Sequence, residues 1–114
     1  MNTKDSNTIR HMLKYCEQIN ETSLEFDNSK ERFIESTTFR NAVCLCLLQI
    51  GELVTVLSDE FKANNAKIPW REIKLLRNIV AHHYGKVDFD IIWDILITDI
   101  PELHHFCKNI IDEQ

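Results

Sequence analysis

Two glycines and two prolines in 114 residues are the strongest constraint on the fold, because few positions favour a reversal of the chain. Such a chain is expected to form a handful of long helices rather than many short strands. Its length suffices for one domain with its own core and is too short for two. We therefore expect a single all-α domain over residues 1–114.

Apolar residues recur at helical spacing along the chain. After a start over residues 1–6 that we expect to be frayed, a first stripe contains Ile9, Met12, Leu13, Cys16 and Ile19. Residues 22–30 interrupt the pattern, and residues 31–58 resume it with a middle that is apolar almost all round, typical of a central helix. Ser36 to Thr38 predict a kink or a split there, and Gly51 predicts the close approach of another helix.

The second half of the chain begins with a polar loop expected over residues 60–68. Pro69 then opens a helix over residues 70–84, and Gly85 is placed to be its C-terminal cap. Asp88 predicts the N-cap of a fourth helix over residues 89–97, where a strand is the alternative because β-branched residues crowd the segment. A fifth helix is expected to begin at residues 99–101 and to run through Ile110.

The helix over residues 70–84 divides into two faces when its residues are placed at 100° intervals. The apolar face, expected to pack on the core, consists of Ile73, Leu76, Ile79, Val80, His83 and Tyr84. The other face is polar, basic and free of acids, and consists of Arg71, Lys74, Arg77, Asn78, Ala81 and His82. A basic face of this kind is suited to binding an anion.

The net charge of −5 is unevenly distributed along the chain. Six basic residues and one acid lie between Lys62 and Lys86, whereas the remainder of the chain carries a net charge of −10. Because the local potential, more than the total charge, attracts an anionic ligand, the basic segment is compatible with RNA. The acidic remainder suits a basic protein partner.

The cysteines, the histidines, the glycines and the apolar runs of the sequence predict no metal, cofactor, disulfide or membrane span. The four cysteines lie within apolar helical patterns, so we expect buried free thiols in a reducing cytoplasm: Cys16, Cys44, Cys46 and Cys107. Adjacent histidines at 82–83 and 104–105 diverge by about 100° on a helix, so neither pair is arranged to chelate one metal ion. There is no Gly-rich phosphate loop, and no apolar run approaches the ~18 residues of a membrane span.

Arg77 and His82 are the residues with catalytic potential. An arginine that holds a phosphate and a histidine that moves protons are the minimum for metal-independent cleavage of RNA by its own 2′-hydroxyl. Five positions apart on a helix, the two side chains diverge by about 140°, so one chain cannot easily aim both at one phosphate. A two-fold dimer would gather two copies of each around one cleft, and the small Ala81 would let the two helices approach.

The segment RNIVAHHY resembles the Arg-x4-His-x-Tyr motif of the HEPN superfamily, in particular of the HepT-like toxins. The segments IGELVTVLSDEF, IPWREIKLLRN and VDFDIIWDILITDIPEL are similar to that family in order and spacing, over roughly residues 37–110. The resemblance implies a homodimeric HEPN-type bundle of four to five helices that acts as a metal-independent RNA endonuclease toxin. His83 departs from the family pattern, in which small or varied residues are common at this position.

The same resemblance implies residue roles and a partner. Arg77 and His82 correspond to the catalytic pair, and Asn78 to a supporting polar residue. The partner is an MNT-type nucleotidyltransferase antitoxin of a type II-like toxin–antitoxin pair. In that family the antitoxin silences the toxin by transferring AMP to the motif tyrosine, which is Tyr84 here.

Three further basic residues, Arg71, Lys74 and Lys86, are expected to guide tRNA or mRNA to the site by charge. Two other functions fit the same residues. The chain can be a non-catalytic helical binding subunit of a nucleotidyltransferase, or a purely structural dimer module. Arg77→Ala and His82→Ala test the nuclease, because unchanged toxicity in cells would exclude that function. A purely structural dimer module predicts that Tyr84→Phe changes no regulation by a co-expressed nucleotidyltransferase.

Overall fold

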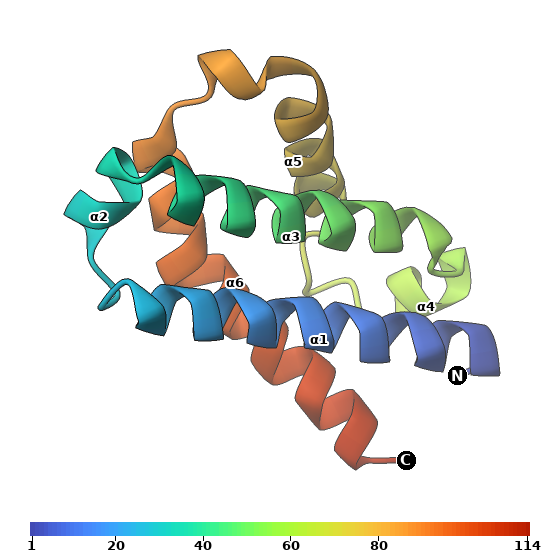
Figure 1. Ribbon diagram of the computed structural model, residues 1–114. Coiled ribbons are helices and arrows are strands. Elements are labelled where there is room, and N and C mark those ends of the chain that lie inside the picture. The colour runs from blue at the N-terminus through green and yellow to red at the C-terminus, as the bar shows by residue number, and fades with distance from the viewer.

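The computed structural model describes residues 1–114 as helices joined by short connections, without any strand (Figure 1). The helices are α1 (Thr3–Glu25), α2 (Lys30–Glu35), α3 (Thr37–Val56), α4 (Asp59–Asn64), α5 (Trp70–His83) and α6 (Phe89–Asp112), with a 3₁₀ turn η1 (Tyr84–Lys86) after α5. The predicted all-α class is therefore confirmed. Four of these helices are long and form the body of the bundle.

Helix α3 is the central element of the bundle. It runs antiparallel to α1 on one side and packs against α5 on the other, while α6 crosses α1 (Figure 1). By length and composition α3 is the one helix that could span a membrane. Its residues Phe39, Val43, Leu47, Ile50 and Val54 are buried in the common core of the bundle.

The polar run at Ser36 splits two helices, as one of the two sequence alternatives predicted. Ser36 ends α2 and begins α3, and its hydroxyl accepts a hydrogen bond from the Phe39 N–H at 3.1 Å. Phe33 anchors the short α2 in the core, with its ring 5.1 Å from that of Phe39 and 5.5 Å from that of Trp93. At its other end, the Ser29 hydroxyl caps α2 by accepting from the Arg32 N–H at 3.2 Å, so a side-chain cap and one buried aromatic residue hold a helix of only six residues.

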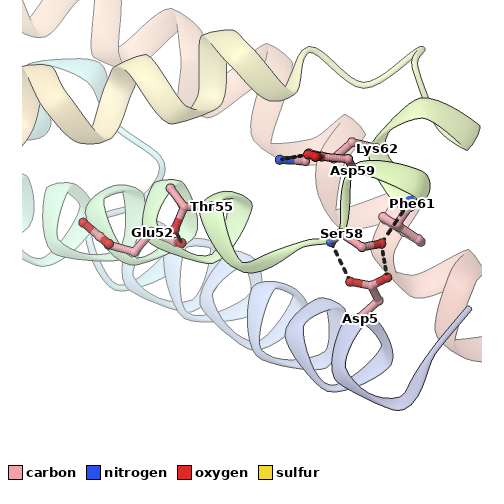
Figure 2. A network of polar contacts seen from close by, with 7 residues as sticks. All are labelled: Asp5, Glu52, Thr55, Ser58, Asp59, Phe61 and Lys62. Atoms are coloured by element: carbon pink, nitrogen blue, oxygen red, sulfur yellow. Dashed lines mark hydrogen bonds and ion pairs between the residues drawn. The ribbon is translucent and has the colours of Figure 1, made fainter.

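The expected frayed start is wrong, because Asp5 is buried and binds a distant part of the chain. Its carboxylate accepts hydrogen bonds from the Ser58 N–H at 2.9 Å and from the Ser58 hydroxyl at 2.6 Å (Figure 2). The same hydroxyl caps α4 by accepting from the Phe61 N–H. Part of the polar segment expected to be a loop is therefore helix α4, and Ser58 is the N-cap residue of this helix.

Residues 89–112 form one helix, so the prediction of two helices there is wrong, as is the alternative of a strand. Pro101 lies inside α6 and has no N–H to donate to the carbonyl of Ile97. Both residues are on the exposed side of the helix, where water can bind that carbonyl. The buried stripe continues without a break from Leu96 through Ile100 to Leu103 and stabilises the helix across the proline.

All four cysteines are buried and unpaired, which confirms the prediction of free thiols. Burial raises the pKa of the Cys44 thiol to about 11 and that of Cys107 to about 12. These thiols therefore stay protonated and behave as small apolar side chains at neutral pH.

Candidate active site

The close contact between α3 and α5 fixes the position of Arg77. Gly51 of α3 faces this residue, and a Cβ atom at position 51 would clash with the Arg77 Cβ and lie 3.2 Å from the carbonyl oxygen of Ile73. Only glycine leaves room for α5 at this distance. The close helix approach predicted for Gly51 is thus present, and it is Arg77 that occupies the space.

Two neighbouring side chains orient the guanidinium of Arg77. Its Nε donates to the carboxylate of Glu52 on α3, and its Nη1 donates to Oδ1 of Asn78 at 2.6 Å. The side chains of Arg77 and Glu52 are 31% and 45% exposed, so the pair lies at the edge of the interface, within reach of solvent. Nη2 has no partner within the chain and is left to bind an oxygen of a ligand.

His82 lies on the opposite, outward side of α5, where it is exposed. Leu75 and Ile79 share this side and are 46% and 40% exposed. The sequence had placed Ile79 and His83 on the core face and Arg77 on the open polar face, and these three placements are wrong. The core-facing arc is rotated toward Arg77, because Gly51 lets α3 approach that side of α5.

Tyr84 belongs to the side of α5 that faces α3. Its hydroxyl donates to Oδ1 of Asn41, and its ring meets that of Phe89 edge to face at 5.7 Å. Burial and the neighbouring Cys44 raise the pKa of Tyr84, whereas the guanidinium of Arg40 lowers it in part. Tyr84 is therefore a neutral phenol at physiological pH, half-buried against the first turns of α3.

The end of α5 differs from its predicted form. Gly85 does not adopt the positive φ of a glycine cap, and α5 instead tightens into the 3₁₀ turn η1, closed by a hydrogen bond from the Val87 N–H to the Tyr84 carbonyl at 3.3 Å. This turn carries Tyr84 toward Asn41. His83 at the last position of the helix is exposed.

The three other basic candidates, Arg71, Lys74 and Lys86, are exposed and make no ion pair with an acid of the chain. Their charges are thus available to an external anion. Within the described chain no group of three His, Cys, Asp or Glu side chains is placed to hold a metal ion. The polar surface of α5 therefore offers cationic and hydrogen-bonding groups to a ligand.

Sequence reasoning missed Glu52 and Asn41, the two α3 residues that hold Arg77 and Tyr84. Glu52 follows Gly51 directly, and a glycine beside an acid in an otherwise apolar helix was a signal for a helix crossing with a polar function. Asn41 carried no comparable signal. Neither partner could be assigned, because 25 and 43 positions separate the bonded residues.

This strand-free helical bundle agrees with the HEPN-type fold that the sequence resemblance implied. The comparison with family models agrees and is specific: the ribonuclease HepT-like family matches residues 12–110. The chain belongs to this family, which identifies its activity class as ribonuclease.

Proteins similar in sequence to this chain are also named as ribonucleases. A provisionally named RNase of Caldanaerobacter subterraneus subsp. tengcongensis is 33% identical over 106 residues, which cover 93% of each chain. One from Methanocaldococcus jannaschii is 32% identical over 88 residues, covering 74% of this chain and 73% of its own. A provisionally named ribonuclease HepT of Thermococcus cleftensis is 34% identical over 73 residues, 64% and 66% of the two chains. No solved structure matches the chain significantly.

Proposed function

We propose that the protein is a metal-independent RNA endonuclease whose active site is shared between two copies in a homodimer. The observation that carries this proposal is the division of α5: Arg77 is held against α3 with Nη2 free, whereas His82 is exposed on the other side. One chain does not aim both side chains at one phosphate. Two copies related by a two-fold axis can supply an arginine from one and a histidine from the other.

The proposed reaction is an internal transesterification of RNA. His82 of one copy takes the proton of the 2′-hydroxyl, and the 2′-oxygen forms a bond to the adjacent phosphorus. The bond from phosphorus to the 5′-oxygen breaks, and this leaving oxygen takes the proton that the same histidine has accepted. The products are a 2′,3′-cyclic phosphate and a 5′-hydroxyl. Arg77 stabilises the negative charge that develops on the phosphate oxygens, and Asn78 supports the arginine.

RNA binding is proposed to depend on Arg71, Lys74 and Lys86, which are exposed and unpaired. Each phosphate contact releases counterions, so removal of one of these charges is expected to lower the salt slope of RNA binding by about 1. The proposed substrates are tRNA or mRNA in the cytoplasm.

Regulation is proposed to occur at Tyr84. A nucleotidyltransferase antitoxin of the MNT type would attach the α-phosphorus of ATP to the tyrosine oxygen, with pyrophosphate as the leaving group and loss of the phenolic proton. The hydroxyl donates to Asn41, so the modification would break this contact with α3. The added nucleotide is large and anionic and would repel RNA from the nearby basic side chains. The chain would then be the toxin of a toxin–antitoxin pair.

Subunit complementation tests the shared site most directly. Arg77→Ala and His82→Ala homodimers are each expected to leave RNA intact in excess EDTA. A mixture of the two variants, after exchange of subunits, is expected to recover cleavage, because one of its two sites contains both side chains. Fragments must end in 2′,3′-cyclic phosphate. Retained cleavage by both single variants contradicts the proposed catalytic pair.

If the unaltered protein leaves RNA intact, two explanations are open, and the mass of the protein distinguishes them. An added AMP indicates a silenced nuclease, and removal of the AMP must restore cleavage. An unmodified and inactive protein favours the second candidate, a non-catalytic binding subunit of a nucleotidyltransferase. The exposed, unpaired acids Glu72, Asp99 and Glu102 would then bind the basic partner.

A further inference from the structure

A cavity of about 120 Å³ opens between α3, α5 and α6. Its floor consists of core residues, including Leu47, Ile50 and Leu103, which are almost inaccessible to solvent. Ile73 of α5 and Ile95 of α6 form walls that are half-buried. The cavity therefore leads from the surface directly to the hydrophobic core, with room for one aliphatic side chain.

The opening of the cavity is acidic. Glu72, Asp99 and Glu102 contribute to its lining, and no lysine, arginine or histidine does. All three carboxylates are exposed, and none takes part in the four ion pairs of the chain. Burial and the charge of Glu102 raise the pKa of Asp99, so the Asp99 carboxylate lies in a negative local potential that a cation would relieve.

The position of the cavity keeps it separate from the candidate active site. Glu72 and Ile73 are on the α6-facing side of α5, about 80° and 180° around the helix from His82 by standard helix geometry. Neither His82 nor Arg77 is among the residues that line the cavity. This surface can thus serve a second function at the same time as RNA binding.

We propose that this cavity is the docking site of a basic segment of another protein, which inserts one large aliphatic side chain flanked by lysine or arginine. The apolar floor would bind the aliphatic group, and the unpaired carboxylates would pair with its basic neighbours. The acidic rim excludes RNA and anionic membrane surfaces by charge. The inference does not depend on nuclease activity, since it rests on cavity residues outside the proposed catalytic pair.

A designed peptide tests the proposal in solution. The probe is an acetylated, amidated, alanine-based helix of about 14 residues with one leucine, a lysine four positions before it and a lysine three positions after it. Methyl NMR of the full-length protein reports binding at Ile73 and Ile95, with Ile9 and Ile19 of α1, which do not line the cavity, as references. We expect saturable shifts at the first pair only.

Charge reversal supplies the specificity test. Asp99→Lys together with Glu102→Lys is expected to weaken peptide binding at least ~10-fold. Asp94→Lys together with Asp112→Lys is the matched control, because it makes the same charge change at exposed, unpaired positions of α6 outside the cavity, and it should alter binding less than ~2-fold. Replacement of the peptide leucine by alanine, or of both lysines by glutamate, is also expected to weaken binding at least ~10-fold.

Four results would overturn the proposal. If the Ile73 and Ile95 methyl signals do not shift at millimolar peptide, the site is excluded. If the glutamate peptide binds equally well, the cavity binds apolar groups without selecting for basic residues. Binding of isobutylammonium as tight as that of the peptide makes it a small-cation site. Contacts from a second copy at these methyl groups, abolished by Leu75→Asp, mean that the exposed apolar side of α5 fills the cavity in a homodimer.

Discussion

The two sides of α5 carry the two halves of the proposed catalytic pair, and they differ in what holds them. On the side that faces α3, Arg77 is fixed by Glu52 and Asn78, and Tyr84 by Asn41. On the outward side, His82 is exposed next to exposed apolar residues. The fold thus orients Arg77, the proposed phosphate-binding residue, within one chain. His82, the proposed proton-transfer residue, is not held by any such contact within the chain.

The largest expected effect falls on the outward side. His82→Ala should lower RNA cleavage by ~10²–10⁴-fold, because a general acid–base contributes about that much. The melting temperature should not change, since the side chain is exposed. His11→Ala, also at an exposed position, is the control and should cleave normally. Normal cleavage by His82→Ala would remove the outward side from the mechanism.

The second prediction concerns the packing on the α3 side. Gly51→Ala should destabilise the protein by ~1–3 kcal/mol in urea unfolding, because the added methyl group clashes with Arg77 and α5 has to shift. Gly85→Ala is the matched control, since no atom lies within 4 Å of a Cβ there and the backbone φ is not positive. Equal stability of the two variants would show that the close helix contact is not required.

A smaller effect is expected when the arginine is kept and only its partner is changed. Glu52→Gln should reduce cleavage about 10-fold, because a less firmly held guanidinium is misplaced relative to the phosphate. A fall in kcat with little change in KM is expected, together with partial rescue by Glu52→Asp. Glu60→Gln, which removes an exposed and unpaired acid, is the control. Unchanged cleavage by Glu52→Gln, with Arg77→Ala inactive, would show that Glu52 does not position the arginine.

The smallest effect is a loss of stability in alkali. Burial raises the pKa of Cys44 to about 11 and also raises that of Tyr84, so the folded state binds more protons than the unfolded chain above about pH 9. Their contribution is complete below that pH and is lost as the pH rises through the folded values. Urea unfolding at about pH 7 and about pH 10.5 measures the loss, which Cys44→Ala should reduce. A stability that stays constant over this range contradicts the buried, neutral state of the two side chains.

The helical class and the chemical inventory of this protein could be predicted from the amino-acid sequence alone. Scarce glycine and proline with apolar stripes at helical spacing specify long helices, because these are local properties of the backbone and of amphipathic faces. The N-cap predicted at Asp88 is present and is equally local. The motif segment identified Arg77, His82 and Tyr84 as candidates, since residue type and spacing are written in the chain.

The direction in which these candidates face depends on packing between helices. Gly51 brings α3 against Arg77, and this contact turns the arginine inward and leaves Ile79 in solvent, although a helical wheel placed them the other way. Asp5 is held by Ser58 across 53 positions, and Pro101 is tolerated because its side of α6 meets water. Each of these outcomes depends on contacts between residues far apart in the chain, which no local pattern contains.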